Sequence, residues 1–308
     1  MSSSSHHQVT ILLLLATILI FDRVHQVQSF SVINGKVVNG GGGATAAASS
    51  TTEPKPVNGE NDKNNNIQEL NISFVTGNQM KARELAMILS EYLATENNKK
   101  KSSDADDDDD DSNNLPFAFN VRTINVDLPE IQEVNTEAIA KEKALLAAQL
   151  AGGPCVVEDT SLKFHALGGM PGPYIKWFQE KLKSDGLYKI LMAYEDKSAT
   201  ASCTLAFCPA PHADPILFTG EIHGRIVEPV PGRGFGWDSI FVPNGSPDDQ
   251  PFSCMTIEEK NQYSHRGKAV RQWAQWVSKN KDALLERQSG QRAIGHKGLD
   301  FKCISPED

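Results

Sequence analysis

The sequence predicts an α/β fold built on a mixed β-sheet, and two patterns along the chain predict it. In the first half, short strand patterns alternate with helical patterns, which is typical of strands joined through helical crossovers. In the second half, two longer strand patterns follow one another as a hairpin, so the sheet is not purely parallel. With 308 residues and a hydrophobic fraction of 39%, the chain can form one large domain, which we place at residues 70–280.

The elements of the first half follow from apolar spacing and from chain breakers. Apolar residues from Ala82 to Leu93 fall on one stripe at helical spacing. Gly152-Gly153-Pro154 ends a second helix. In order, we expect a strand at 72–75, a helix at 79–93, a loop at 97–114, a strand at 117–126, a helix at 136–151, and a strand at 156–157 that ends at Glu158-Asp159-Thr160.

The second half contains helices first and the hairpin afterwards. We expect helices at 174–182 and 187–194, strands at 201–208 and 216–227 that turn across His212-Ala213-Asp214, and a last helix with Val270, Trp273, Ala274 and Val277 on one side. Residues 281–308 are polar and are predicted to be a loose tail.

The N-terminal region is predicted to be a targeting segment and a linker. Residues 9–21 are apolar but too few to span a bilayer comfortably. Val27-Gln28-Ser29 offers a cleavage site, which predicts a signal peptide at 1–29, although Met1 to Gln8 has no Lys or Arg. The junction at Ser29-Phe30 also resembles two-part plastid leaders, so the secretory pathway and the plastid stay open. Residues 30–69 are predicted to be a low-complexity linker.

The net charge and the cysteines exclude several kinds of site. Asp104 and Asp106 to Asp111 supply seven negative charges, and without them the net charge of −9 becomes about −2. This insertion at 97–114 is best explained as a solvated loop, because it lacks the glycine and terminal Glu of a calcium-binding loop. Five cysteines without CxxC spacing argue against zinc and against a disulfide framework. Cys155 and Cys203 are expected to be buried.

A first polar cluster is suited to phosphate. Thr76-Gly77-Asn78 joins a strand to a helix whose free amide groups favour an anion, and Lys81 adds a positive charge. An ordinary helix cap explains the same residues about as well. In the helix at 136–151, Lys143 lies on the apolar stripe and needs an anionic partner, whereas Lys141 lies on the opposite side.

Two carboxylates are candidate ligands of a divalent metal. Magnesium prefers oxygen ligands and needs only one or two carboxylates when the substrate supplies phosphate oxygens. Glu130 and Asp159 fit this requirement, and Asp159 is expected at a strand end, where ligands of open α/β sheets collect. The alternatives are a cap on the next turn for Asp159 and an ordinary surface position for Glu130.

A second cluster is suited to a purine base. Phe235 is expected to stack on the base, and Arg266 provides donors that suit a 6-oxo purine rather than adenine. Trp237 is better explained as a core residue, and His265 either touches the base or is structural. Gly232, Gly234 and Gly236 do not form a dinucleotide fingerprint, because no helix is expected after them.

Six motifs occur in order along the chain: Thr76-Gly77-Asn78-x-x-Lys81-x-x-Glu84, Asp127-Leu128-Pro129-Glu130, Val157-Glu158-Asp159-Thr160, Gly168-Gly169-x-Pro171-Gly172-Pro173-Tyr174-Ile175-Lys176-Trp177-Phe178, Phe235-Gly236-Trp237-Asp238 and Ser264-His265-Arg266. Together they resemble the inosine triphosphate pyrophosphatases, a family of non-standard purine triphosphate pyrophosphatases, over about residues 70–278.

The resemblance implies a two-lobed fold with an elongated sheet, a cleft between the lobes and a homodimer. It implies hydrolysis of ITP, dITP and XTP to the monophosphate and pyrophosphate with Mg²⁺, for which Mn²⁺ is a candidate substitute. Glu130 and Asp159 would bind the metal, and Asp159 would also help to activate water. The residues implied in nucleotide binding are Thr76, Gly77, Asn78, Gln79, Met80, Lys81, Lys143, Asp159, Thr160, Lys176, Phe235, Gly236, Trp237, Asp238, Lys260, His265 and Arg266.

The chain departs from the family pattern at Ser239, where proline is usual, and at Cys254, where an acidic residue is usual. The alternatives are a nucleotide-binding regulator without hydrolysis and an acidic secreted cation-binding protein. We expect no nucleic-acid partner and no stable membrane insertion after leader removal. The family resemblance alone would place the protein in the cytoplasm.

Overall fold

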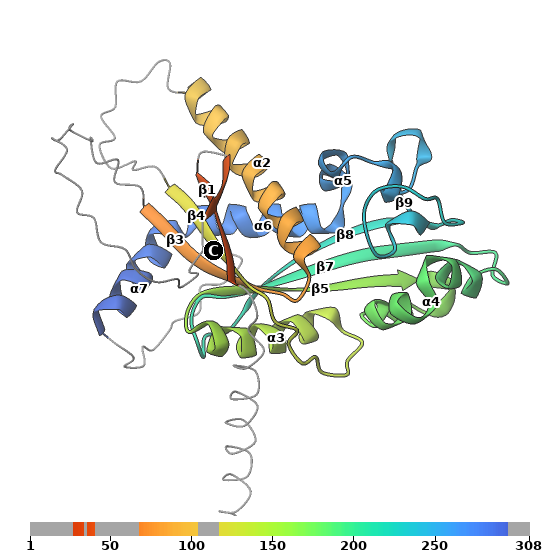
Figure 1. Cartoon of the computed structure of the whole chain (residues 1–308), viewed down its shortest axis with the longest axis horizontal. Coiled ribbons are helices and arrows are strands. Elements are labelled where there is room, and N and C mark those ends of the chain that lie inside the picture. The colour runs from red at the N-terminus through yellow and green to blue at the C-terminus, as the bar shows by residue number, and fades with distance from the viewer. Residues whose placement is uncertain (1–26, 34–35, 41–67, 104–116, 295–308) are drawn as a thin grey trace, which may run out of the picture.

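The computed structural model describes residues 27–33, 36–40, 68–103 and 117–294. These residues form one nine-stranded sheet in the order β2-β1-β4-β3-β5-β7-β8-β9, with β6 beside β5 (Figure 1). The strands are β1 Val27–Ile33, β2 Lys36–Gly40, β3 Gln68–Val75, β4 Phe117–Ile124, β5 Cys155–Phe164, β6 Pro171–Gly172, β7 Ser198–Cys208, β8 Ile216–Ile226 and β9 Phe241–Pro243.

The pairing confirms a mixed, elongated sheet. β3 pairs in parallel with β4 and β5, whereas β5, β7 and β8 pair antiparallel along their length. β3 ends at Val75 and meets β5 only near Cys155, so β5, β7 and β8 continue well beyond it. We call the part around β1 to β4 the first lobe. The second lobe is the continuation of β5, β7 and β8 with β6, β9 and the segments packed on them.

Helices cover both faces of the sheet. They are α2 Gln79–Ser103, α3 Thr136–Ala151, α4 Ile175–Ile190, α5 Ile257–Tyr263, α6 His265–Lys279 and α7 Lys281–Ile294, with short 3₁₀ turns η1 His165–Leu167, η2 Asp238–Ile240, η3 Pro247–Asp249 and η4 Phe252–Cys254. α2 and α6 lie on one face and α3 on the other (Figure 1).

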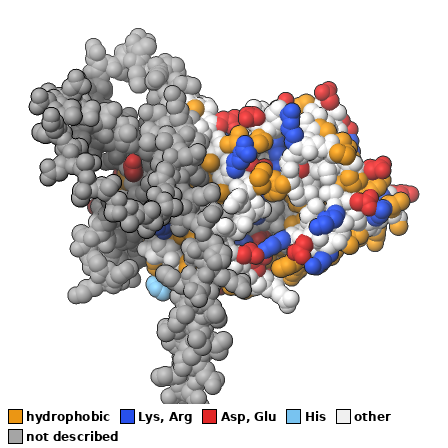
Figure 2. Space-filling view, in the orientation of Figure 1, with side chains coloured by type: hydrophobic (Ala, Val, Ile, Leu, Met, Phe, Trp, Pro, Cys, Tyr) orange, Lys and Arg blue, Asp and Glu red, His pale blue; other side chains and the backbone are white. Residues whose placement is uncertain are grey.

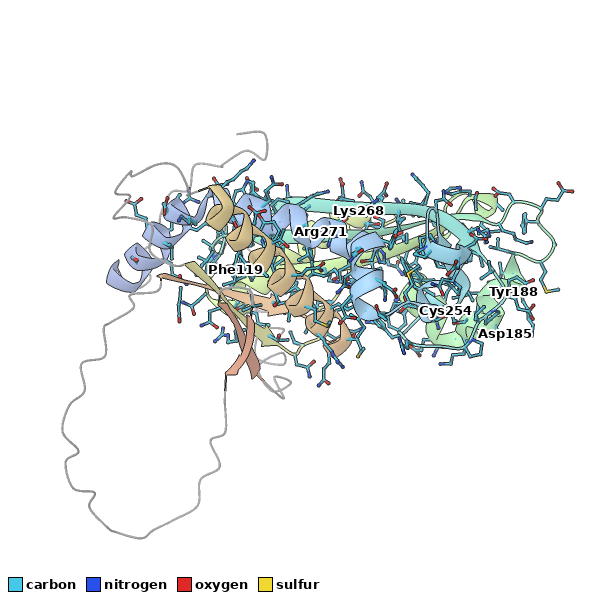
Figure 3. The ribbon with its side chains drawn as sticks, turned by 90° about the horizontal axis from the view of Figure 1, so that it is seen from above. Phe119, Asp185, Tyr188, Cys254, Lys268 and Arg271 are labelled. Atoms are coloured by element: carbon cyan, nitrogen blue, oxygen red, sulfur yellow. The ribbon has the colours of Figure 1, made fainter. Side chains whose placement is uncertain are left out.

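Three apolar clusters hold these layers together. The first lies between the sheet and α2 and α6, where Phe119 of β4 packs edge-on against Trp273 at 6.0 Å between ring centroids (Figure 3). The second packs the alanines of α3 on Val157 and Ala206. The third fills the second lobe around Phe241. The face shown in Figure 2 carries basic and acidic side chains interspersed over the described part of the chain.

Helix α3 has the bounds that the sequence predicts. The Asn135 side chain accepts hydrogen bonds from the Glu137 and Ala138 amides at its start, and Gly152 follows its end with φ of 66°. This left-handed conformation costs a residue with a Cβ atom about 1 to 2 kcal/mol.

We therefore expect Gly152→Ala to lower the free energy of unfolding by about 1 to 2 kcal/mol, because alanine must adopt the left-handed conformation. Gly153→Ala is the matched control. Its Cβ atom would meet no atom within 4 Å, and its φ lies outside the left-handed range. Urea denaturation of the full chain measures both, and equal midpoints for the two variants would contradict the account.

Several predicted boundaries within residues 70–280 are wrong. α2 continues past Leu93 to Ser103, because no glycine or proline interrupts the segment. The predicted loop at 97–114 is therefore helical up to Ser103, and residues 104–116 lie outside the described residues. The two helices predicted at 174–182 and 187–194 form α4, which Lys183 interrupts with φ of 56° and which ends at Ile190.

The predicted loose tail is wrong for residues 281–294, which form α7. Leu284 is buried in the cluster beneath α2 and α6. The Gln288 side chain exchanges two hydrogen bonds with the backbone of Asn71 in β3, at 3.2 and 3.3 Å. A few apolar residues in a polar helix suffice to dock it, and the overall polarity of the segment concealed them.

The predicted linker at 30–69 needs correction, because β2 lies inside it and β1 extends into it from Val27. The predicted targeting segment at 1–29 stays a prediction. β1 pairs antiparallel with β4 from Val27 opposite Ile124 to Ile33 opposite Ala118, and β2 extends the sheet further. The missed signal is the pair Asn34-Gly35 between two β-branched runs, which favours a hairpin. The remaining residues of this region, 1–26, 34–35 and 41–67, lie outside the described residues.

Other predictions are confirmed. β7 and β8 form the predicted hairpin, and α6 carries the predicted apolar side. Cys155 and Cys203 are buried, and burial raises the pKa of both thiols. Among the described residues, no helix combines the length and apolar character that crossing a membrane requires.

Candidate active site

One cavity of about 570 Å³ lies where β3 ends and the second lobe begins. Its size is in the usual range for small-molecule sites. All the residues that the sequence singles out line it: Thr76, Gly77, Asn78, Gln79, Met80, Lys81, Glu130, Lys143, Asp159, Thr160, Lys176, Phe235, Gly236, Trp237, Asp238, Lys260, His265 and Arg266. Segments that are distant in sequence therefore converge on one space.

At one end of the cavity, the turn from β3 into α2 presents the start of a helix. The Asn78 side chain accepts hydrogen bonds from the amides of Met80 and Lys81 at 2.9 and 3.3 Å, so Asn78 caps α2. Lys81 reaches across to Glu158 at 3.0 Å and to the Thr160 hydroxyl at 3.1 Å. The capping role and a cationic cavity wall are thus both present.

Lys143 finds the anionic partners that its place on an apolar stripe requires. Its Nζ lies 2.8 Å from Glu130, 3.5 Å from Asp159 and 3.0 Å from the Glu158 carbonyl oxygen. Burial alone would lower the pKa of Lys143, but Asp159 and Glu130 raise it above its ordinary value. Lys141 is exposed, as expected.

Asp159 is a buried carboxylate with one unsatisfied oxygen. Its Oδ2 atom has no hydrogen-bond partner within the described part of the chain. Burial raises the pKa of Asp159 to about 6, an effect that Lys143 and Lys81 offset only in part and that Glu130 and Glu158 reinforce. A carboxyl group that titrates near neutral pH is suited to accepting a proton.

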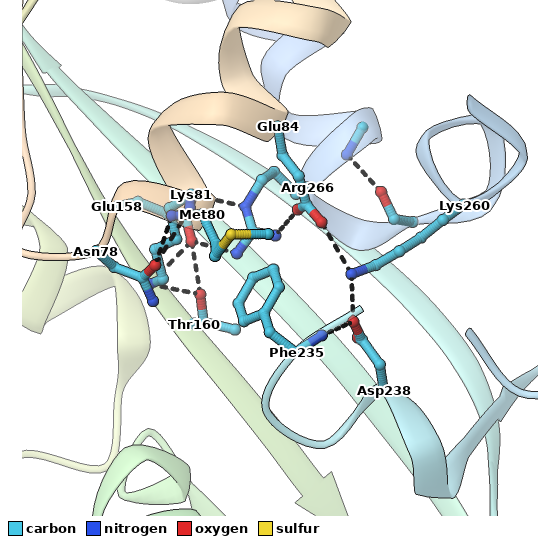
Figure 4. Close-up of polar contacts among 12 residues, drawn as sticks. Asn78, Met80, Lys81, Glu84, Glu158, Thr160, Phe235, Asp238, Lys260 and Arg266 are labelled. Carbon is cyan, nitrogen blue, oxygen red and sulfur yellow. Dashed lines mark hydrogen bonds and ion pairs between the residues drawn. The ribbon is translucent and has the colours of Figure 1, made fainter. Parts of the chain in front are cut away.

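A network of buried charges connects the two ends of the cavity (Figure 4). Arg266 donates two hydrogen bonds to Glu158, both at 2.8 Å, and a third to Glu84. Lys260 lies 2.9 Å from Glu84 and 2.7 Å from Asp238. Because Glu158 also binds Lys81, carboxylates and cations alternate from the α2 turn to the Phe235 loop.

Each carboxylate in this network has a perturbed pKa. Burial would raise the pKa of Glu158, but Arg266 and Lys81 lower it well below its ordinary value. Burial would also raise the pKa of Glu84, but Arg266 and Lys260 lower it below its ordinary value. Burial raises the pKa of Asp238, and Lys260 offsets this only in part. Three of the five Arg266 N–H groups are thus occupied by carboxylates.

Aromatic rings line the other end of the cavity. Phe235 is half-buried, with Lys260 Nζ at 4.8 Å from its ring centroid. Trp237 packs in the second-lobe core against Phe241, with 5.5 Å between the ring centroids, which confirms its core role. The His265 ring centroid lies 5.3 Å from that of Trp237, and neither ring nitrogen of His265 has a hydrogen-bond partner among the described residues. Burial, with Arg266 and Lys260, holds the pKa of His265 well below its ordinary value, so the ring is neutral.

Helix α4 of the second lobe bridges the cavity mouth. Lys176 forms an exposed ion pair with Asp127 of the first lobe, at 2.9 Å. One turn further along α4, the Gln179 side chain donates to the Gly236 carbonyl at 2.8 Å.

Four polar residues that line or support the cavity were not among the predicted site residues, although the first three belong to the motifs: Glu84, Asp127, Glu158 and Gln179. Glu84 could have been found by the argument used for Lys143, because it lies four residues before the buried Ile88 on α2. Gln179 carries no sequence signal. The expected strand end at Asp159 is wrong, because β5 continues to Phe164 by pairing with β7. Asp159 nevertheless lies beyond the end of β3, where the cavity opens.

Fold and cavity together define a two-lobed α/β protein with carboxylates and lysines at one end of its cleft and aromatic rings at the other. Residues 72–276 match the model of the Ham1 family. The chain belongs to the Ham1 family.

Relatives and solved structures agree with this assignment. The inosine triphosphate pyrophosphatase of Puccinia graminis f. sp. tritici is 43% identical over 213 residues, which cover 68% of this chain and 98% of the fungal protein. The inosine triphosphate pyrophosphatase of Ajellomyces capsulatus is 42% identical over 210 residues, which cover 67% of this chain and 96% of the fungal protein. The Ham1 proteins of Staphylococcus aureus and Coxiella burnetii share the fold, with TM-scores of 0.51 and 0.52 at 22% and 24% identity. Each match covers 68% of this chain and 99% of the bacterial chain.

Proposed function

We propose that this protein hydrolyses ITP, dITP and XTP to the nucleoside monophosphate and pyrophosphate, with Mg²⁺ as the metal. The observation that carries the proposal is the convergence of Lys81, Lys143, Asp159 and Phe235 on one cavity. Cations and helix amides suit a triphosphate, and a ring with neighbouring donors suits a base. The fungal relatives, whose names state inosine triphosphate pyrophosphatase activity, support the same substrate class.

The residues present fit a magnesium ion. In the described part of the chain, no three His, Cys, Asp or Glu side chains gather in a metal-binding group. Two carboxylates, however, are what Mg²⁺ uses when substrate phosphates supply further oxygens. Lys143 already places a cation between Glu130 and Asp159 Oδ1, and Asp159 Oδ2 has no hydrogen-bond partner among the described residues. Glu130 and Asp159 would therefore hold the ion, which neutralises developing phosphate charge when bound.

The chain's own groups account for the other steps. Lys81, Lys143 and Lys176 bind the phosphates, which requires Lys176 to exchange Asp127 for a phosphate oxygen. Asp159 accepts the proton of the attacking water. Phe235 stacks on the base, and the unpartnered ring nitrogens of His265 and the remaining Arg266 N–H groups meet the base edge.

A substrate panel with the full chain tests the proposal. Pyrophosphate release is measured with ITP, dITP, XTP, GTP and ATP in the presence of Mg²⁺. We expect turnover of the first three and weak turnover of ATP, whose 6-amino group would face donors. No turnover of ITP, dITP and XTP would end the proposal.

Removal of divalent metal is expected to stop the reaction. With EDTA in excess, turnover of ITP should fall by at least about a hundredfold, because the loss of several kcal/mol of charge stabilisation corresponds to such a factor. Added Mg²⁺ should restore it, and Mn²⁺ is expected to substitute. Calorimetric titration of the nucleotide-free protein measures whether Glu130→Gln weakens Mg²⁺ binding. Full activity in EDTA would contradict the metal requirement.

We also propose that two copies of the chain associate. Large apolar side chains of the second lobe are exposed, among them Trp177 at 53%, Met192 at 64% and Tyr194 at 44%. Exposed apolar surface of this kind favours a protein partner. Analytical ultracentrifugation of the full chain measures its oligomeric state.

The proposed destination, the secretory pathway or the plastid, is supported by the apolar run at 9–21 alone.

A further inference from the structure

We propose that Gly220 of β8 is a positioning residue for base recognition, because only a residue without a side chain lets the first turn of α6 place His265 and Arg266 at the cavity. This inference rests on the proposed function, since both residues belong to the base end of the same site. Gly220 itself is not among the residues that line the cavity, and it belongs to none of the motifs found in the sequence.

The approach between Gly220 and α6 leaves no room for a methyl group. A Cβ atom at Gly220 would lie 2.1 Å from the His265 carbonyl oxygen, 2.7 Å from the Ala269 nitrogen and 2.8 Å from Lys268 Cβ. The two shortest contacts involve backbone atoms, so no side-chain rotation relieves them and the start of α6 has to move. The φ of Gly220 lies outside the left-handed range, so the close approach alone requires glycine.

Side chains of α6 fasten the helix to β8 on both sides of Gly220. At this point β8 pairs with β7 through Cys203, and β9 pairs only from Gly224 onward. The Lys268 ammonium group donates to the Glu221 carbonyl at 2.8 Å (Figure 3), and the Gln272 amide donates to the Thr219 carbonyl at 3.3 Å. α6 therefore supplies donors to carbonyl groups of β8 immediately before and after the glycine.

On its opposite side, the first turn of α6 packs just as closely against the end of α5. A Cβ atom at Gly267 would lie 2.0 Å from the Asn261 carbonyl oxygen, and the Gly267 amide donates to Ser264 Oγ at 2.9 Å. The first turn of α6 is thus held between β8 and α5. It cannot shift away from Gly220 without disturbing α5, which carries Lys260.

This position of the α6 turn determines the base end, because the His265 ring has no hydrogen bond to any described residue that could hold it. Its position depends on the backbone turn and on packing against Trp237 and Phe252, at 5.3 and 6.3 Å between ring centroids. Arg266, the next residue, has to reach Glu84 and Glu158 from the same turn. Moving the turn displaces both residues, whereas Asp159 and Lys143 belong to β5 and α3.

The test compares Gly220→Ala with the wild-type full chain. We expect the KM for ITP to rise about ten- to a hundredfold, the scale of a misplacement near 1 Å. kcat should change much less, because the groups at the phosphate end stay in place. The preference for ITP over ATP, measured as a ratio of kcat/KM values, should shrink by a similar factor.

Val277→Ala is the matched control on the same helix. Val277 is fully buried but lies three turns from His265, so its truncation should lower Tm without changing the KM for ITP. If Gly220→Ala lowers Tm and leaves the KM and the substrate preference unchanged, Gly220 is merely structural and the proposal is overturned.

A second variant covers the case in which Gly220→Ala fails to fold. The double variant Lys268→Ala/Gln272→Ala removes the two bonds to β8 without a clash, and it should raise the KM for ITP several-fold; an unchanged KM overturns the proposal. The His265 ring signals in NMR spectra provide a readout without substrate. They should shift in Gly220→Ala and not in Val277→Ala, even if the wild type proves inactive on ITP, in which case only the proposed function fails.

Discussion

Replacing Asp159 with asparagine is expected to slow pyrophosphate release from ITP by about a thousandfold, within the range for loss of a general base. Asparagine keeps the shape of the side chain but accepts no proton and carries no charge for a metal. The buried, unpartnered Oδ2 atom and the pKa of about 6 support this role. A steady-state assay with saturating ITP measures the effect.

The pH dependence provides an independent check. Because the carboxylate form must accept the proton, kcat/KM should fall about tenfold per pH unit below pH 6. The remaining activity of Asp159→Asn should lack this inflection. An unchanged inflection near pH 6 in the variant would assign the titration to another group.

Stability separates lost chemistry from lost folding. The pKa of Asp159 is raised in the folded state, so the folded protein holds this proton more tightly than the unfolded chain. Stability is therefore lost as pH rises through about 6, by an amount on the order of 3 kcal/mol. Asp159→Asn should consequently unfold at a higher temperature than the wild type at pH 7.5, with the difference vanishing near pH 4. An inactive variant that is more stable would locate the loss in the chemistry.

Arg266→Met is expected to have the largest effect on stability. It removes the cation shared by Glu84 and Glu158, and breaking a buried ion pair from one side costs about 3 to 5 kcal/mol. Urea denaturation at pH 7.5 measures the difference in the free energy of unfolding. The deficit should shrink as pH falls, because the two carboxyl groups, no longer held ionised by Arg266, become neutral.

Arg271→Met is the control for this prediction. Arg271 lies on the same helix but donates to the carbonyl oxygens of Asn261 and Gln262, at 2.8 and 3.1 Å. Its loss should cost about 1 to 3 kcal/mol, the net value of two hydrogen bonds, and without a pH dependence. If both variants lose the same free energy of unfolding at every pH, the Arg266 ion pairs stabilise the fold no more than the Arg271 hydrogen bonds do.

The sequence predicted the parts of the fold that local patterns determine. α3 has both predicted bounds, because Asn135 and Gly152 act within the helix they cap. β5 was predicted too short, since the residues from Glu158 to Lys163 look polar and loop-like until β7 pairs with them. α7 was missed for the same reason, because its partners Asn71 and the cluster beneath α2 and α6 lie elsewhere in the chain. The β1–β2 hairpin was missed although Asn34-Gly35 favours it locally.

The candidate site was predicted more completely than the fold. Every proposed site residue lines the cavity. These residues could be identified in the sequence because charged and aromatic side chains stand at places where a fold alone does not require them. The residues that support the site from outside the cavity were harder to predict. Glu84 is far from Arg266 in sequence and meets it only in the folded chain. Gly220 matters because the backbone of α6, which is distant in sequence, packs directly against it.

The continuous passage of β5, β7 and β8 through both lobes limits how the protein can move. A cleft between domains that are joined by loops can open like a hinge, at a few soft dihedral angles. Here such opening would require bending three paired strands of 10 or 11 residues each. We therefore expect substrate entry to depend on peripheral parts: α4, whose ion pair from Lys176 to Asp127 is exposed, and the segment at Gly236 to which Gln179 donates a hydrogen bond.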